Sequence, residues 1–314
     1  MALHLVTGGA GFIGSHLAAG LIAAGHQVRI LDNLSTGNRD NLRDIADRVD
    51  FQTGDITDDA ALAAAMRGVD CVFHCAALAS VPRSVVEPLA THLACATGTL
   101  QVLNQARQCG VRRVVYSASS SAYGDQPTPR KKETDLPLPL SPYAAAKLAG
   151  ELYATAAYRT YGLETVSLRY FNVFGPRQDP NGPYAAVIPK FISAIVNRER
   201  PAIFGDGKQT RDFTHVANVV AANMRAAEAP GVAGRVFNVG SGEALDLLTL
   251  LDKLGAILGA KIEPIFEPAR VGDVRDSLAD VSAAREVLGY TPQVGIDEGL
   301  RQTAAWFQNN AAGR

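Results

Sequence analysis

The chain has 314 residues, of which 47% are apolar and 19% are charged, so it can bury a large core, and disordered and fibrous classes are excluded. Its 30 Lys and Arg residues nearly balance its 31 Asp and Glu residues, which gives a formal charge of -1. Because no overall field would attract polyanions, we expect no nucleic-acid partner and no membrane partner, and a ligand phosphate must be bound locally.

Membrane, secreted and metal-binding classes are also disfavoured by the sequence. The longest apolar stretch, residues 69–81, contains Asp70 and His74 and is too short for a membrane helix. The first apolar segment leads into a glycine-rich turn rather than a cleavage site, so we expect a cytoplasmic protein. We expect reduced thiols and no metal, because the four cysteines lack metal-site spacing: Cys71, Cys75, Cys95 and Cys109.

Short apolar segments alternate with segments of helical periodicity in the first half of the chain. The expected strands are residues 3–7, 27–31, 49–53, 71–76, 111–117 and 165–168. The expected helices are residues 60–66, 84–108 and 142–161, the last with Ser141 as its N-cap and Pro142 in its first turn. This alternation predicts an α/β fold built on a Rossmann-type, doubly wound parallel sheet.

The composition changes after about residue 168, where loops rich in Gly, Pro and Asn predominate, as in residues 175–184 and 205–209. We expect short strands and two further helices in this part. The predicted domains are therefore a Rossmann domain of residues 1–170 and a smaller C-terminal α/β domain of residues 171–314. Part of residues 205–240 is expected to return to the first domain.

A glycine-rich turn follows the first strand and opens a helix. Gly8 permits the tight turn, Gly11 lets backbone N–H groups approach a pyrophosphate, and Gly14 allows the helix to pack closely on the sheet. Asp32 ends the second strand, 18 residues after Gly14, where a carboxylate would accept both ribose hydroxyls. The combination predicts a dinucleotide site.

The type of dinucleotide follows from Asp32 and its neighbours. A carboxylate would repel a 2′-phosphate, and Asn33 and Leu34 offer no arginine to receive one, so NAD is favoured over NADP. Asp55 and Ile56, after the third strand, are candidate adenine contacts, although a plain loop cap explains them nearly as well.

Tyr143 and Lys147 lie four residues apart on the predicted helix 142–161, so they share a face with about 6 Å of axial rise between them. Lowering the pKa of a phenol from about 10 to about 7 takes roughly 4 kcal/mol. One positive charge at about 5 Å supplies about 3 kcal/mol of this at an effective dielectric constant near 20. We expect the nicotinamide charge to supply the remainder, which would make Tyr143 a general base.

A run of hydroxyl side chains, residues 117–121, follows the fifth predicted strand at the sheet edge where open α/β sheets bind ligands. Ser119, Ser120 and Ser121 could hydrogen-bond a substrate hydroxyl and relay its proton. A serine-rich loop that caps itself is the structural alternative.

Together these motifs resemble the extended short-chain dehydrogenase/reductase family and, within it, the UDP-hexose 4-epimerases. The resemblance covers nearly the whole chain and is carried by residues 7–14, Asp32, residues 117–124, Tyr143, Lys147 and residues 169–176. It implies that Tyr143 is the base, that Lys147 assists it and holds the nicotinamide ribose, and that Ser119 is the catalytic serine.

The resemblance also implies two sets of binding residues. NAD would be bound by Gly8, Gly11, Phe12, Ile13, Gly14, Asp32, Asn33, Asp55, Ile56, Ala76, Ala77, Ser117, Tyr143, Lys147 and Tyr170. The UDP-sugar would be bound by Ser80, Ser119, Ser120, Ser121, Tyr143, Asn172, Val187, Phe204, Arg211, Arg270, Asp273 and Ser277.

Arg211 and Arg270 match the two diphosphate arginines of the family, and a diphosphate does require cationic partners in a neutral chain. Ion pairs with Asp212 or Asp273 are the structural alternative. The chain departs from many relatives at Cys95, where they carry Asn, and at Ala79, which leaves Ser80 as the polar substrate contact.

The implied reaction is NAD-dependent 4-epimerisation of a UDP-hexose through a transient 4-keto sugar. Tyr143 would take the C4 hydroxyl proton, directly or through Ser119, while hydride leaves C4 and later returns to the other face of the ketone. The nucleotide-sugar 4,6-dehydratases differ, because they carry an acid pair where this chain has Ser120 and Ser121. UDP-glucuronate 4-epimerases and decarboxylases stay open, although several carry Thr where this chain has Asn172.

A non-catalytic NAD-binding sensor is disfavoured, because it would have no reason to keep Tyr143 and Lys147. The sugar preference follows from Ser277, which falls where relatives restricted to plain hexoses carry Tyr. A small residue leaves room for an N-acetyl group, so we expect UDP-N-acetylglucosamine and UDP-N-acetylgalactosamine as the main pair and UDP-glucose and UDP-galactose as the secondary pair. By analogy, helices 84–108 and 142–161 are expected to form a homodimer interface.

Overall fold

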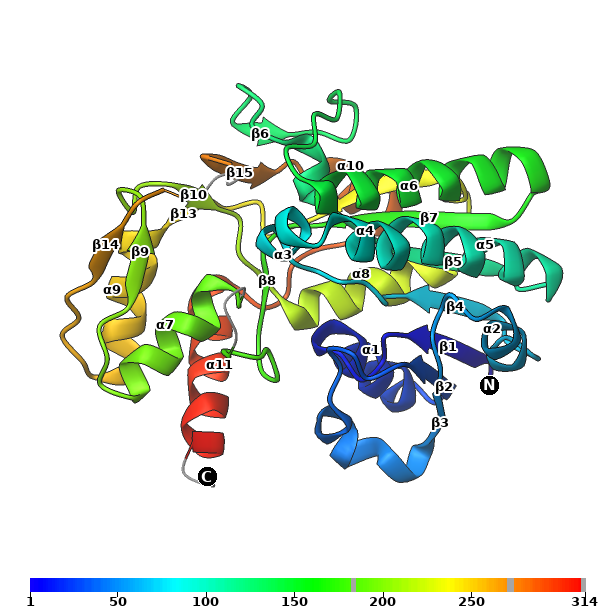
Figure 1. Cartoon of the computed structure of the whole chain (residues 1–314), viewed down its shortest axis with the longest axis horizontal. Helices are drawn as coiled ribbons and strands as arrows, with labels where there is room; N and C mark the ends of the chain where they lie inside the picture. The colour runs from blue at the N-terminus through cyan, green and yellow to red at the C-terminus, as the bar shows by residue number, and fades with distance from the viewer. Residues whose placement is uncertain (182–184, 270–273, 312–314) are drawn as a thin grey trace.

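A central parallel sheet organises the larger lobe of the molecule in the computed structural model, which describes residues 1–181, 185–269 and 274–311 (Figure 1). The sheet has seven strands in the order β12-β7-β5-β4-β1-β2-β3, all parallel. Its strands are β1 (Leu3–Thr7), β2 (Gln27–Asp32), β3 (Val49–Thr53), β4 (Cys71–His74), β5 (Arg113–Ser119), β7 (Glu164–Tyr170) and β12 (Arg235–Val239). The predicted fold class is confirmed.

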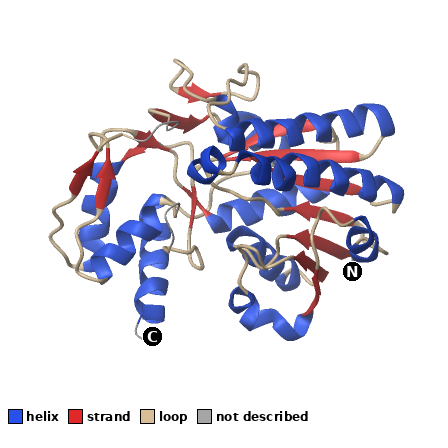
Figure 2. Ribbon diagram, viewed as in Figure 1, coloured by secondary structure: helices blue, strands red, loops and turns tan. Residues whose placement is uncertain are grey.

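Helices cover both faces of this sheet (Figure 2). One face packs against α1 (Phe12–Ala23), α8 (Val216–Glu228) and α10 (Ser282–Leu288). The other face packs against α2 (Asp59–Ala65), α5 (Gly98–Gln108) and α6 (Pro142–Tyr161). Strand order changes direction between β1 and β4, which is the point where doubly wound sheets bind ligands.

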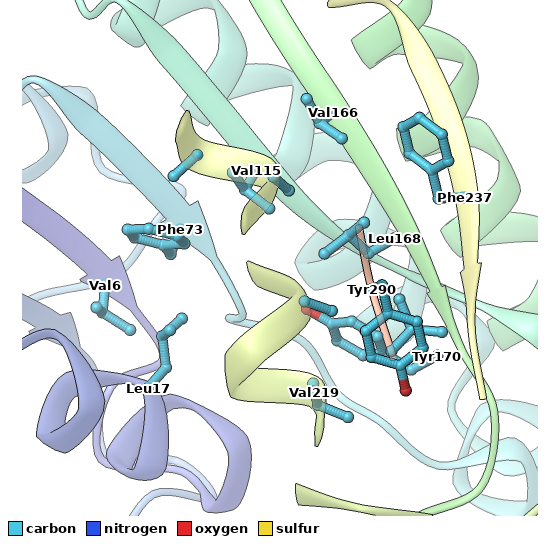
Figure 3. Close-up of a cluster of buried hydrophobic side chains, with 14 of the residues drawn as sticks. Val6, Leu17, Phe73, Val115, Val166, Leu168, Tyr170, Val219, Phe237 and Tyr290 are labelled. Atoms are coloured by element: carbon cyan, nitrogen blue, oxygen red, sulfur yellow. The ribbon is translucent and has the colours of Figure 1, made fainter. Parts of the chain in front are cut away.

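The period-two alternation of the strands divides the core into two layers. Val6, Phe73 and Val115 project from β1, β4 and β5 into the layer beside α1 and α8, as Figure 3 shows. Their neighbours Leu5 and Val72 face the opposite layer. Strands that are apolar on both faces are typical of a parallel sheet covered by helices on both sides.

Helix α6 has the predicted bounds and begins as expected. The Ser141 hydroxyl accepts a hydrogen bond from the Ala144 N–H at 3.2 Å, and Pro142 occupies the first turn. The helix ends at Gly162, whose φ of 73° is the left-handed conformation that glycine tolerates. This fixed start sets the position of Tyr143 at the sheet edge.

The single helix expected over residues 84–108 is wrong. The structure has α3 (Val81–Val86), α4 (Pro88–His92), a π-helical turn η2 (Leu93–Thr97) and α5. Pro88 lacks an N–H and disfavours helical geometry at Glu87, whose ψ is 61°. The helix is therefore interrupted between α3 and α4.

The smaller lobe has its own core, formed by α7 (Val187–Val196), α9 (Leu247–Leu258) and α11 (Ile296–Ala311). The expectation of two further helices after residue 168 is also wrong, since the described residues contain five, α7 to α11. The remaining elements are η1 (Arg39–Arg48), η3 (Ser120–Tyr123), β6 (Arg130–Lys131), β8 (Val173–Phe174), β9 (Ala202–Phe204), β10 (Thr210–Arg211), β11 (Thr214–His215), β13 (Leu245–Asp246), β14 (Ile265–Glu267) and β15 (Asp276–Ala279).

The chain passes between the lobes more than once. Strand β12 pairs with β7 at the edge of the large sheet, and β6 joins a four-stranded sheet of order β13-β10-β15-β6. A domain boundary at residue 170 remains a prediction. Within the described ranges, no helix is long and apolar enough to cross a membrane, and no group of three or more His, Cys, Asp or Glu side chains could hold a metal ion.

Candidate active site

The glycine-rich turn between β1 and α1 is closely packed against the neighbouring backbone. Gly8 has a φ of 68°, and a Cβ at Gly8 would lie 2.7 Å from the backbone of Ala76. A Cβ at Gly14 would collide with the carbonyl oxygen of Gly8. Helix α1 follows its N-cap residue Gly11, with no side-chain cap and no acidic residue in its first turn, so its start suits an anionic ligand.

Asp32 is buried at the end of β2 and holds the adjacent loops. Its carboxylate accepts hydrogen bonds from the N–H groups of Ala10 at 2.9 Å and Leu34 at 2.8 Å. The neighbouring Asn33 donates from its side-chain amide to Asp55 at 2.6 Å. Three of the predicted cofactor residues therefore gather at the ends of β2 and β3.

The other predicted cofactor residues lie along the same edge of the sheet. Ile56 is buried against Gly98, and Ala77 packs in a small cluster with Tyr143. The Ser117 hydroxyl shares a hydrogen bond of 3.1 Å with the Tyr170 hydroxyl, which also accepts a bond from the Asn223 amide at 2.7 Å. Asn223 is a polar residue of this network that no sequence motif marks.

A cavity of about 500 Å³ opens at the carboxyl ends of the strands, between the two lobes. It brings together residues from distant parts of the sequence: Phe12, Ile13, Ser119, Ser120, Ser121, Tyr143, Tyr170, Asn172, Val187, Phe204, Arg211 and Ser277. Among the described lining residues, Ser80 is missing; its hydroxyl accepts a hydrogen bond from the Arg83 N–H and caps α3. The predicted Arg270 and Asp273 lie outside the described residues.

Two of the predicted catalytic residues, Ser119 and Tyr143, line this cavity, whereas Lys147 is not among its lining residues. Ser119 hydrogen-bonds the Tyr143 phenol, and the Ser119 and Ser121 hydroxyls share a bond of 2.8 Å. Burial raises the pKa of Tyr143, and the bond with Ser119 lowers it. The desolvation of a buried phenolate therefore opposes the lowering that the sequence analysis expected from Lys147.

Lys147 is buried one turn further along α6, with 3% of its surface exposed. Burial lowers its pKa. Its ammonium lies 4.5 Å from the centroid of the Tyr116 ring, a contact that the sequence analysis did not foresee. Cys95 is fully buried beside Tyr143, with its thiol 3.9 Å from the Leu78 carbonyl oxygen.

The far side of the cavity is built on the pairing of β10 with β15. Arg211 and Ser277 are Cα partners in this parallel pair, and both line the cavity. The Arg211 guanidinium donates to the carbonyl oxygens of Thr210 at 2.8 Å and Arg275 at 3.1 Å. Ser277 is only 7% exposed, so a substituent there must point into the protein or into the cavity.

Asp212 fixes this arrangement and was considered in the sequence only as an ion-pair partner of Arg211. Its fully buried carboxylate accepts bonds from the N–H groups of Ser241, Gly242 and Ala279 and from the hydroxyls of Thr214 and Ser241. These bonds tie β10 to β15. A lone acidic residue beside an arginine gives no sequence signal for this role.

The chain matches known proteins along most of its length. Residues 4–240 match the model of the NAD dependent epimerase/dehydratase family. A UDP-glucose 4-epimerase of Mycolicibacterium smegmatis is 42% identical over 312 residues, which cover 98% of this chain and 99% of that protein.

Solved structures of related enzymes are also similar to the chain along most of its length. The UDP-N-acetylglucosamine 4-epimerase from Methanobrevibacter ruminantium M1, in complex with UDP-N-acetylmuramic acid, matches with a TM-score of 0.94 and 42% identity over 98% of this chain and 99% of that one. The UDP-glucose 4-epimerase of Thermus thermophilus, in complex with NAD, matches with a TM-score of 0.90 and 36% identity over the same shares.

Proposed function

This chain belongs to the NAD dependent epimerase/dehydratase family, and we propose that its preferred substrates are UDP-N-acetylglucosamine and UDP-N-acetylgalactosamine. The enzyme is an NAD-dependent UDP-sugar 4-epimerase, an isomerase. What carries the finer proposal is the position of Ser277, a small buried residue beside Arg211 in the cavity wall.

The turn after β1 fits NAD in this structure. The close approaches at Gly8 and Gly14 leave no room for side chains, and the uncapped start of α1 at Gly11 suits the pyrophosphate. The Asp32 carboxylate would hold the adenine ribose. When bound there, NAD would supply a reversible hydride acceptor for C4 of the sugar, which is a chemistry without net redox change.

The proton is handled by residues of this chain. We infer that Tyr143 takes the proton of the C4 hydroxyl, because its phenol lines the cavity and is hydrogen-bonded to Ser119. Ser119 orients the hydroxyl and can relay the proton through the bond it shares with the phenol. The Lys147 ammonium favours the phenolate by its charge. When the 4-keto sugar has turned over, Tyr143 gives the proton back to O4.

The nucleotide would be bound at the opposite end of the cavity. Arg211 and Phe204 both line the cavity, which supports Arg211 as a partner of the diphosphate and Phe204 as a contact of the uracil. Asn172 and Val187 also line the cavity. The sugar is therefore expected between Ser119 and Ser277.

Ser277 supports the N-acetyl preference by volume. The position is buried and faces the cavity, so an aromatic ring there would occupy space that the serine leaves open. Competing substrates test the proposal directly. The purified enzyme is offered UDP-N-acetylglucosamine, UDP-glucose and UDP-glucuronate separately, and kcat/KM is compared after product separation. A higher value for UDP-glucose or UDP-glucuronate would contradict it.

We also propose a homodimer, supported by a group of exposed apolar residues on adjacent helices. Helices α4, α5 and α6 and the turn η2 carry Leu89, Leu93, Leu100, Leu152 and Tyr153, which are 42% to 84% exposed. Such a face on a monomer typically marks an interface. Leu89→Glu should give monomers in light scattering, whereas Leu136→Glu, on an exposed loop elsewhere, should not. If light scattering shows that both variants are dimers, the proposed interface is wrong.

A further inference from the structure

Lys147 is a buried cation whose charge has to be stabilised inside the protein. Only 3% of its surface is exposed, and burial lowers its pKa. None of the ion pairs found among the described residues includes Lys147. A buried ammonium without a carboxylate needs another source of negative potential.

The Tyr116 ring supplies that potential. Tyr116 is fully buried on β5, and its ring centroid lies 4.5 Å from the Lys147 ammonium. The negative face of an aromatic ring attracts a cation, and the attraction is stronger in a desolvated site. Unlike a carboxylate, the ring carries no net charge. Lys147 therefore keeps its full positive charge available to Tyr143, one turn away on α6.

Tyr116 is itself held against the same helix. Its hydroxyl donates a hydrogen bond of 3.1 Å to the backbone carbonyl oxygen of Lys147. A Cβ at Gly150 would collide with that hydroxyl, so α6 can approach the ring only with glycine at this position. The ring thus contacts both the side chain and the backbone of one residue.

His74 stacks on Tyr116 and is held in a neutral form. The ring centroids lie 5.6 Å apart at an interplanar angle of 28°. The His74 Nδ1 pairs with the Thr7 hydroxyl at 2.8 Å and Nε2 with the Thr99 hydroxyl at 3.0 Å. Thr99 donates its own proton to the Cys95 carbonyl oxygen, so it accepts from Nε2–H, which assigns the proton to Nε2. Burial lowers the pKa of His74 to about 3, so His74 adds no positive charge beside Lys147 at neutral pH.

We propose that Tyr116 is a positioning residue for Lys147, because its ring face holds the ammonium while its hydroxyl holds the backbone of the same residue. The proposal rests on the proposed role of Lys147 beside the base. It predicts that the ring face matters more than the hydroxyl.

Steady-state kinetics of the holoenzyme test the proposal with three variants. Tyr116→Leu removes the ring face and should lower kcat about ten- to thirty-fold, with KM changed less than about three-fold. The rise of kcat with pH should move to higher pH, because the base loses a nearby positive charge. Tyr116→Phe keeps the ring and should therefore retain most of the kcat that Tyr116→Leu loses. Phe73→Leu is the matched control, since Phe73 is equally buried and faces the opposite core layer.

Equal losses of kcat in Tyr116→Leu and Phe73→Leu would overturn the proposal, as would equal losses in the Leu and Phe variants of Tyr116. If Tyr116→Leu does not fold, Gly150→Ala displaces the same ring. Gly150→Ala should lower kcat, because the added methyl group would collide with the Tyr116 hydroxyl and with the ring carbon that carries it. An unchanged kcat in Gly150→Ala would count against the proposal.

A readout without substrate separates this proposal from the proposed function. In protein labelled with 13C-lysine, the ε-methylene signal of Lys147 should be shifted upfield by the Tyr116 ring current, and Lys147→Arg assigns it by its disappearance. The shift should persist in Tyr116→Phe and vanish in Tyr116→Leu. An unshifted signal in the parent protein would refute the contact even if the enzyme is a 4-epimerase. A shifted signal in a protein without 4-epimerase activity would refute the proposed function alone.

Discussion

Ser277→Tyr should change the sugar preference of the enzyme. Ser277 and Ala279 are the buried positions of β15, two residues apart, so their side chains point to the same side of the strand. With Ser277 only 7% exposed and lining the cavity, a tyrosine ring at this position has to enter the cavity or displace the core. Cavity entry leaves plain hexoses their space and removes the space for an N-acetyl group.

The expected size of the effect follows from overpacking. Forcing extra atoms into a packed site costs about 1–3 kcal/mol, and pocket contacts of this kind discriminate by about 10- to 200-fold. We therefore expect kcat/KM for UDP-N-acetylglucosamine to fall about 100-fold and that for UDP-glucose to fall less than about three-fold. The assay is kcat/KM for both sugars, measured on the same preparation of each variant.

Two control variants distinguish a change in the shape of the cavity from general disruption of the protein. Ser277→Ala keeps the space and should leave both values within about two-fold. Leu278→Tyr places a ring at the next position of β15, whose side chain points away from the side of Ser277, and should leave the ratio of the two values unchanged. Equal losses for both sugars in Ser277→Tyr would show that this side chain does not line the sugar site.

Three further predictions follow from the site. Asp32→Ala should reduce the NAD released on denaturation of the purified protein, and NADP in the parent, measured by chromatography, would contradict the cofactor assignment. Tyr143→Phe should lower turnover by about two orders of magnitude with UDP-sugar binding changed only a few-fold, and Ser119→Ala should cost less; near-normal turnover in Tyr143→Phe would exclude it as the base. His74 has a folded-state pKa lowered to about 3, so the unfolded state binds more protons between pH 6.5 and 3, and stability falls as pH falls through that window. His74→Gln should flatten this dependence by up to about 1.4 kcal/mol per pH unit in urea unfolding, and an unchanged slope would contradict it.

Local sequence patterns predicted the sheet and helix α6, because both depend on features that short segments contain. Apolar alternation marks the strands, and Ser141 with Pro142 marks a helix start wherever the segment lies. The break at Glu87 was missed although Pro88 signals it, because the apolar periodicity continues across it. The π-helical turn η2 has no comparable signal, since its geometry depends on the residues packed around it.

In the candidate site too, some residues are recognisable from local sequence and others are not. Tyr143, Ser119 and the glycines are recognisable because their spacing is fixed by one helix, one strand end and one turn. The meeting of Arg211 with Ser277 depends on the register of two strands separated by more than 60 residues, which no local pattern encodes. The contact between Tyr116 and Lys147 likewise needs β5 and α6 to be packed together, with Gly150 between them.

The electrostatics of the site explain why Tyr143, the proposed base, needs stabilisation from its neighbours. Burial shifts Tyr143 and Lys147 toward their neutral forms, the first by raising the pKa and the second by lowering it. A phenolate in this position is therefore unfavourable unless positive charge and hydrogen bonds converge on it. Ser119 provides one hydrogen bond, and an ammonium held by an uncharged ring provides undiminished positive charge. A carboxylate paired with Lys147 would stabilise the ammonium better but offset its effect on Tyr143, whereas an uncharged aromatic partner is compatible with a tyrosine base.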